Sequence, residues 1–134
     1  MQTLEMNTKK KSLFVWTLVI IGGTYLLGQG LPWWSFAPFC LLIGFVARLN
    51  PINAFTIGFF CVFAAWLLQA YLINEQNEGI LAEKMGQVMV GINPFGLLIM
   101  TGAIGGIGGG LALALGSSLR NSLHKRRLSE PTKS

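Results

Sequence analysis

The chain has 134 residues, of which 52% are hydrophobic and 11% are charged, and its formal net charge is +5. Soluble domains contain about 25% charged residues, so this composition excludes an ordinary water-soluble protein. The sequence has no long polar stretch beside its apolar ones, which excludes a separate soluble enzyme joined to a membrane anchor.

Four uncharged apolar runs divide the chain. A helix needs roughly 20 apolar residues, within a range of about 17–25, to cross a membrane. Three of the runs have this length, and the second is shorter. The sequence therefore predicts an all-α polytopic membrane protein with four transmembrane helices, at about residues 13–31, 33–48, 53–73 and 95–117.

Two of these runs have alternative interpretations. The second could be a re-entrant segment, because Pro38 is able to interrupt a helix. The first has the basic front and apolar middle of a secretory signal peptide, but it lacks a small-x-small cleavage site and further spans follow it. We therefore expect an uncleaved first span and a short second one.

The basic residues predict the orientation, because Lys and Arg concentrate on the cytoplasmic side of short loops. Four spans place both termini on one side, and a three-span arrangement would separate the two basic ends. We expect cytoplasmic ends at residues 1–12 and 119–134, a transmembrane domain at 13–118 and an outer loop at 74–94 that contains Lys84. The other nine basic residues then share the cytoplasmic side: Lys9, Lys10, Lys11, Arg48, Arg120, Lys125, Arg126, Arg127 and Lys133.

Three residues are predicted to anchor the chain at the membrane surfaces. Trp33 and Trp34 follow the first span, and indole rings favour the interface between lipid and water. Arg48 lies at the cytoplasmic end of the second span, where its side chain can extend to the headgroups. A nucleic-acid partner is not expected, because no aromatic residues alternate with the basic ones.

The segment 102–116 contains six glycines in its first nine residues. A phosphate-binding loop is excluded, since no Gly-Lys-Ser/Thr sequence occurs there, and a flexible hinge would leave backbone groups unpaired in lipid. A helix remains, with glycines on one side and Ile104, Ile107, Leu111 and Leu115 on the other, while Leu113 falls among the glycines. Small residues spaced by four let helices approach closely; the contact residues are Gly102, Gly105, Gly106, Gly109 and Gly110.

The identity of the helix that meets this glycine face is open. It could be another span of the same chain, with Gly22-Gly23, Gly44 or Gly58 as counterparts. It could also be a partner membrane protein or a second copy of the chain.

Candidate sites for chemistry are few, since none of the four spans contains an ionisable residue within its apolar length. The polar residues inside the spans are expected to form hydrogen bonds that join the helices; they are Thr24, Ser35, Thr56, Gln69 and Thr101. Gln69 is the most informative, because an amide is hard to satisfy in lipid. Cys40 and Cys61 form no CxxC motif and His124 stands alone, so no metal or cofactor is expected.

The outer loop begins with a polar cluster, Asn74, Glu75, Asn77 and Glu78, which together with Gln69 forms the candidate polar site. The alternative interpretation is that this cluster only extends the third helix into water. The apolar residues that follow, between Ile80 and Met89, have the spacing of a short helix that lies on the membrane. Asn93 and Pro94 are predicted to cap and begin the last helix, which extends into the basic tail until disorder begins near Ser129.

Several short sequences together resemble small four-span inner-membrane proteins of Gram-negative bacteria to which no activity is assigned. They are Leu31-Pro-Trp-Trp-Ser35, Asn53-Ala-Phe with Gly58-Phe, Trp66, Asn77 with Leu81 and Lys84-Met85, and Gly116-Ser-Ser-Leu-Arg120. The resemblance implies an inner-membrane location and four spans, and it assigns no catalytic residue.

These features predict a non-enzymatic membrane subunit or assembly factor that packs on a partner membrane protein through its glycine-rich last helix. The alternative is a small oligomeric carrier or channel lined by Gln69. An enzyme that uses Glu75 or Glu78 at the outer surface is a third hypothesis, but no nucleophile–base pair supports it.

Overall fold

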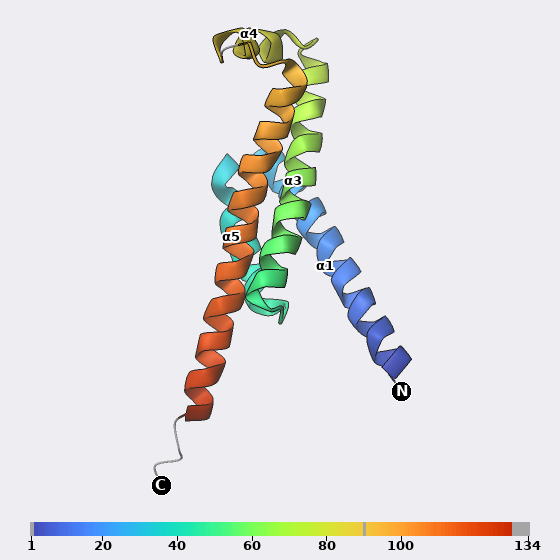
Figure 1. Ribbon diagram of the computed structural model, residues 1–134, viewed down its shortest axis with the longest axis vertical. Helices are drawn as coiled ribbons and strands as arrows, with labels where there is room; N and C mark the ends of the chain where they lie inside the picture. The colour runs from blue at the N-terminus through green and yellow to red at the C-terminus, as the bar shows by residue number, and fades with distance from the viewer. Residues whose placement is uncertain (1, 90, 130–134) are drawn as a thin grey trace.

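A computed structural model describes residues 2–89 and 91–129, with side chains described for 11–89 and 91–127. The described chain is helical and contains no strand, as predicted (Figure 1). Three helices are long and apolar enough to cross a membrane: α1 (Gln2–Gly30), α3 (Pro51–Gln76) and α5 (Pro94–Ser129). The prediction of an all-α chain is therefore confirmed for the described residues, and three of the predicted spans lie on helices whose length and composition suit a membrane.

The second predicted span is shorter than a full span. It consists of a 3₁₀ turn, η1 (Trp33–Ser35), followed by α2 (Phe36–Val46). Pro38 lies in the first turn of α2, where a missing N–H costs little, so it does not break the helix as the re-entrant alternative assumed. From helical rises the segment is roughly 22 Å long, against about 30 Å for the hydrocarbon layer.

The starts of α3 and α5 follow from their sequences. Pro51 and Pro94 each occupy the first position of a helix, where the fixed φ of proline fits and its missing N–H is not needed. The Gly96 N–H donates a hydrogen bond to Asn93 Oδ1 over 2.7 Å, which confirms the predicted cap. α5 continues into the basic tail as expected, and the disorder predicted beyond Ser129 concerns residues 130–134, which lie outside the described chain.

The predicted outer loop contains a helix, α4 (Ile80–Val88), as its apolar spacing indicated. Glu78 and Gly79 adopt positive φ angles of 53° and 73°, and this turn reverses the chain after α3. α4 lies across the ends of α3 and α5 (Figure 1). We refer to this side of the molecule as the α4 end.

The opposite side of the molecule, which we call the basic end, contains the start of α1, the turn between α2 and α3, and the last turns of α5 (Figure 1). α3 and α5 run antiparallel and pack along their length, α2 packs on α5, and α1 diverges from the other helices toward this end. The basic end and the α4 end are the two reference levels for the sites described below.

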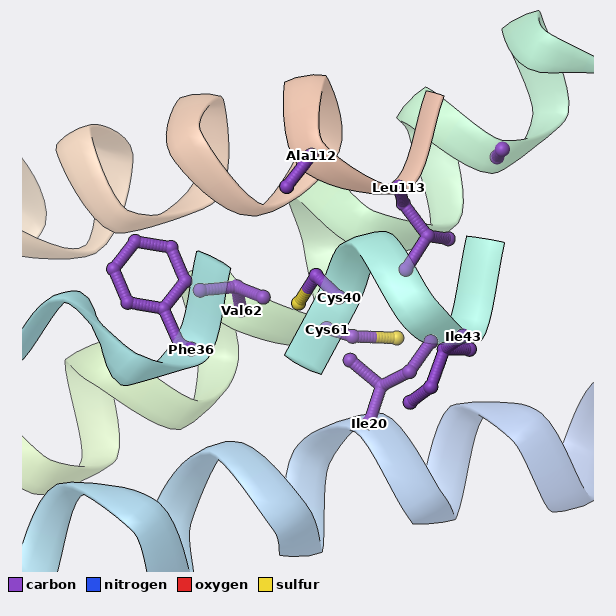
Figure 2. Close-up of a cluster of buried hydrophobic side chains, with 9 residues drawn as sticks. Ile20, Phe36, Cys40, Ile43, Cys61, Val62, Ala112 and Leu113 are labelled. Carbon is purple, nitrogen blue, oxygen red and sulfur yellow. The ribbon is translucent and has the colours of Figure 1, made fainter. Parts of the chain in front are cut away.

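Four helices contribute side chains to one small hydrophobic core (Figure 2). α1 contributes Ile20, which is fully buried, while α2 and α3 contribute Cys40 and Cys61, whose sulfur atoms lie in the centre of the cluster. The remaining members are Phe36, Ile43, Ala54, Val62, Ala112 and Leu113. Cys40 and Cys61 are free thiols in this core, consistent with their predicted role as small hydrophobic groups.

Candidate functional site

The glycine face of α5 packs on α3. One column of glycines, spaced by four residues, meets a column of phenylalanines with the same spacing on α3. The facing pairs are Gly102 with Phe63, Gly106 with Phe59, and Gly110 with Phe55. A Cβ added at Gly106 would lie 2.9 Å from the Phe59 carbonyl oxygen, well inside the 3.5–4.0 Å at which atoms pack best. Only glycine permits this separation of the two helices.

A second glycine column on α5 receives larger side chains from α3. Gly105 lies against the indole of Trp66, and Gly109 lies against Val62. Gly58 is the counterpart on α3, since a Cβ there would come 2.8 Å from the Gly109 carbonyl oxygen. All five predicted contact glycines are buried, and α3 covers each of them.

α2 uses further glycines to approach α5. Gly44 lies against the backbone of Leu113, and Gly116 lies against the Leu41 carbonyl. Gly108 faces the ring of Phe36, at 3.2 Å from an added Cβ. α5 therefore uses its small residues against two neighbours of the same chain at once.

These contacts decide between the alternatives left open by the sequence. α3 and α2 cover the glycine face within the chain, so the expectation that a partner packs on this face is corrected. The physical reason is steric, because a second helix has no access to glycines already in contact with backbone atoms. The side of α5 that remains exposed is the aliphatic one; its residues are Ile104, Ile107, Leu111 and Leu115.

Gln69 lies in a cavity near the α4 end. The cavity has a volume of about 230 Å³ and is formed where the end of α1 and η1 meet α3 and α5. A Cβ at Gly28 would lie 2.5 Å from Gln69 Nε2, so the absence of a side chain on α1 makes room for this amide. Trp66 and Phe36 form one wall with an edge-to-face ring contact, with ring centroids 5.1 Å apart.

Three of the polar residues that were expected to join helices bond within their own segment instead. The Thr56 and Thr101 hydroxyls donate to carbonyls of their own helices, Ile52 O and Leu97 O, over 3.1 and 2.9 Å. Ser35 donates to Pro32 O over 2.6 Å. A hydroxyl can bond to its own helix in this way, whereas the longer Gln69 amide makes no hydrogen bond to another described residue.

Thr24 is the exception among the hydroxyls. It is only 2% exposed, lines the same cavity as Gln69, and its Oγ1 has no hydrogen-bond partner. The neighbouring side chain is the Cys40 thiol, which is a weak hydrogen-bonding group. The cavity is therefore lined by Thr24, whose buried hydroxyl has only this weak thiol beside it, and by Gln69, whose partly exposed amide makes no hydrogen bond to another described residue.

The rest of the predicted polar site is divided. Asn74 lines a second cavity, of about 270 Å³, between α3, α4 and α5, and its Oδ1 is buried without a partner. Asn77 also lines this cavity but is an exposed residue. Glu75 and Glu78 are exposed on the surface of the chain. The structure thus separates Gln69 from the two glutamates.

The predicted interface anchors lie at two different levels. Trp33 and Trp34 are 75% and 56% exposed at the tip of the α1–α2 hairpin. Trp33 lines the same cavity as Ile73, which places the hairpin tip one turn before the polar end of α3. Arg48 is exposed at the basic end, in the turn between α2 and α3, with a positive φ of 51°.

The sequence analysis missed a contact that fixes this turn. The buried Ser117 hydroxyl donates a hydrogen bond to the Leu49 carbonyl and so ties α5 to the α2–α3 turn. Ser117 follows the glycine-rich segment directly in the sequence, but nothing in its spacing indicates this distant acceptor. The phenylalanines of α3 were also missed, although their spacing of four residues was a detectable signal.

Within the part of the chain described with side chains, no three His, Cys, Asp or Glu residues lie close enough together to hold a metal ion. In comparisons with protein-family models, curated proteins and solved structures, nothing matches this chain.

Proposed function

We propose that this chain is a non-enzymatic integral subunit or assembly factor of a bacterial inner-membrane complex, and that it binds its partner through α1. The observation that supports this most directly is the loose attachment of α1. Only 11% of its most apolar segment is buried, against 39% for α5. A helix with so few contacts to its own chain leaves most of its apolar surface to lipid or to another protein.

The open face of α1 has the pattern of a helix-binding surface. Val15, Leu18 and Leu26 are each more than half exposed, and together with Gly22 they are spaced by three or four residues along one side of the helix. No atom of another part of the chain lies within 4 Å of a Cβ added at Gly22. A small residue in the middle of an apolar face allows a second helix to approach closely.

The orientation follows from charge. Lys11, Arg48, Arg120 and the exposed residues 125–127 lie at the basic end, while Glu75, Glu78 and Glu83 lie near the α4 end. The positive-inside rule assigns the basic end to the cytoplasm, and both termini with it.

A short fourth membrane segment formed by η1 and α2 is part of this proposal. Its first turn shares a cavity with Ile73 near the α4 end, and the turn that follows it shares a cavity with Ser12 and Leu13 at the basic end. The segment therefore connects the two levels between which α1 and α3 also run.

A small carrier or channel is a weaker alternative. The cavity around Gln69 occupies the region near the α4 end, and toward the basic end the bundle is filled by fully buried Ile20, Val62 and Leu113. A single chain thus offers no continuous polar path, and transport would require several copies around a shared axis.

The experiment is photo-crosslinking in native membranes, with a photoreactive amino acid in place of one exposed residue at a time. Leu26 on the open face of α1 and Ile104 on the outer face of α5 are matched positions, at 71% and 64% exposure. The proposal expects one protein adduct of defined mass from Leu26, and its loss when Gly22→Leu is added. Gly30→Leu is the control, since Gly30 also has open space around it.

The possible results separate the hypotheses. An adduct from Leu26 that survives Gly22→Leu would contradict a close helix contact at this face. If both positions form adducts only with lipid, the proposed partner protein is contradicted. An adduct between two copies of this chain would favour the oligomeric carrier.

A further inference from the structure

The cavity between the α1–α2 hairpin tip, α3 and α5 has the properties of a ligand site that the proposed partner role does not use. We infer that it binds the uncharged carbonyl group of a membrane amphiphile, with the Gln69 amide and the Thr24 hydroxyl as hydrogen-bond donors. Three properties of the cavity support this inference: its hydrogen-bond donors, its lack of charge and its position.

The donors are the first property. A buried hydroxyl without a strong partner destabilises the fold, and such groups are rare in folded proteins. Thr24 is 2% exposed and could have bonded to its own helix, as Thr17, Thr56 and Thr101 do. Its hydroxyl instead has only the weakly hydrogen-bonding Cys40 thiol beside it, and it borders a cavity that also contains the Gln69 amide. A ligand that accepts hydrogen bonds would satisfy both groups.

The second property is that no lining residue carries a charge. Thr24, Gln69, Ser35 and Thr101 supply the polar side chains of the wall, and the remaining lining residues are glycine or apolar. Ser35 and Thr101 already donate to backbone carbonyls. A phosphate or a carboxylate buried here would lack a counter-charge and would be strongly disfavoured, so the group that enters the cavity is neutral.

The third property is the position of the cavity, at the hairpin tip beside the exposed Trp33, where it extends along α3 from Trp66 to Ile73. Tryptophan favours the boundary between headgroups and hydrocarbon, which is the level of the carbonyl groups of glycerolipids. The volume of about 230 Å³ corresponds to roughly eight water molecules. It accommodates a carbonyl group with its neighbouring atoms, while the acyl or isoprenoid chain remains in the membrane.

Two kinds of amphiphile supply such a carbonyl, namely the ester of a glycerolipid and the ring of an isoprenoid quinone. The test therefore uses three probes with the full-length, delipidated protein in detergent. They are a diacyl phosphatidylethanolamine, the diether phosphatidylethanolamine with the same chains, and decylubiquinone. Native mass spectrometry during titration gives the apparent Kd of each. The two phospholipids differ only in their ester carbonyls, so the ratio of their apparent Kd values measures the contribution of the carbonyl groups to binding.

The variants are Thr24→Val and Gln69→Leu, with Thr56→Val and Gln76→Leu as matched controls on the lipid-facing and exposed surfaces of α3. We expect the diester to bind at least fivefold more tightly than the diether, about the value of one hydrogen bond. Each cavity variant should reduce that ratio toward one, and neither control should change it. Thr24→Val should also raise the unfolding temperature of the lipid-free protein, because it removes an unpaired polar group, and this result guards against loss of folding.

Two outcomes support the inference and distinguish the sources. A diester preference that depends on Thr24 and Gln69 assigns the site to glycerolipid. Equal binding of the two phospholipids, with decylubiquinone bound in a manner that depends on the same two residues, assigns it to a quinone. Equal phospholipid binding without quinone binding would overturn the inference, as would any preference that persists in both cavity variants. None of these outcomes depends on the partner of α1.

Discussion

Gly44 of α2 lies directly on the backbone of Leu113 in α5. The Leu113 side chain falls on the glycine side of its helix and is completely buried in the core shared by four helices (Figure 2). A glycine on one helix thus lets the neighbouring backbone approach, and the large side chain of the same neighbour fills the space beside it. The bundle is organised by such small–large complementarity, which suits a membrane in which packing drives helix association.

Gly44→Ala tests the α2–α5 contact. The added methyl group would collide with backbone atoms that have no rotamer to change, so we expect a loss of about 1–3 kcal/mol in the free energy of unfolding. Unfolding in mild detergent, followed by circular dichroism, measures it. Gly22→Ala is the matched control, because its Cβ meets open space, and it should leave stability unchanged or slightly higher. Equal effects of the two substitutions would contradict the contact.

Ser117→Ala tests the connection between α5 and the α2–α3 turn. The substitution leaves the Leu49 carbonyl without its donor, which should cost about 0.5–1.5 kcal/mol, the net value of one hydrogen bond. The neighbouring Ser118 is half-buried and forms no hydrogen bond to another described residue, so Ser118→Ala should have little effect. Thermal unfolding of both variants gives the comparison, and a Ser118→Ala effect as large as that of Ser117→Ala would speak against this connection.

Much of the fold was predictable from the sequence, because it depends on local periodicity. The apolar runs around residues 53–73 and 95–117 predicted two of the long helices, and the glycine spacing predicted which side of α5 is buried. The neighbour of that side was not predictable. It depends on the matching of Gly106 with Phe59, which lie far apart in the chain, and helical period alone gives no rule for such pairing.

The candidate site was predicted less completely, because the sequence period does not determine which helices pack together. Gln69 was recognisable as an amide with few partners, whereas its position beside Gly28 and Thr24 depends on how α1 crosses α3. The second apolar segment was predicted to be short, and it ends at Val46, but the 3₁₀ turn at Trp33–Ser35 and the positive φ of Arg48 leave no periodic signal in the sequence.

The proposed orientation predicts the labelling of single cysteines. In a background with Cys40→Ala and Cys61→Ala, Glu83→Cys near the α4 end should react with a membrane-impermeant maleimide in spheroplasts. Asn121→Cys on the exposed part of α5 should react only after the membrane is permeabilised, because the basic end faces the cytoplasm. The reverse labelling pattern would show that the proposed orientation is wrong. Labelling of both cysteines in intact spheroplasts would place the two ends of α5 on the same side of the membrane.

Asn93→Ala should shorten or loosen the start of α5. The Asn93 side chain accepts the Gly96 N–H, and loss of a helix cap costs typically about 1 kcal/mol. Hydrogen exchange of the first turn of α5 should accelerate, while Asn121→Ala, on the exposed surface of the same helix, should leave it unchanged. Unaltered exchange in Asn93→Ala would show that the cap contributes nothing to this helix end.

A double-mutant cycle between Val62 and Gly109 tests the central claim, that the glycine face of α5 is filled by α3 of the same chain. The methyl group of Gly109→Ala would collide with Cβ and both Cγ atoms of Val62, and Val62→Gly, which removes all three, should make room for it. We predict that the double variant is more stable than the sum of the single effects by about 0.5–3 kcal/mol. Its unfolding midpoint should not change on dilution. Additive effects, or a midpoint that falls on dilution, would contradict the account and assign the glycine face to another molecule.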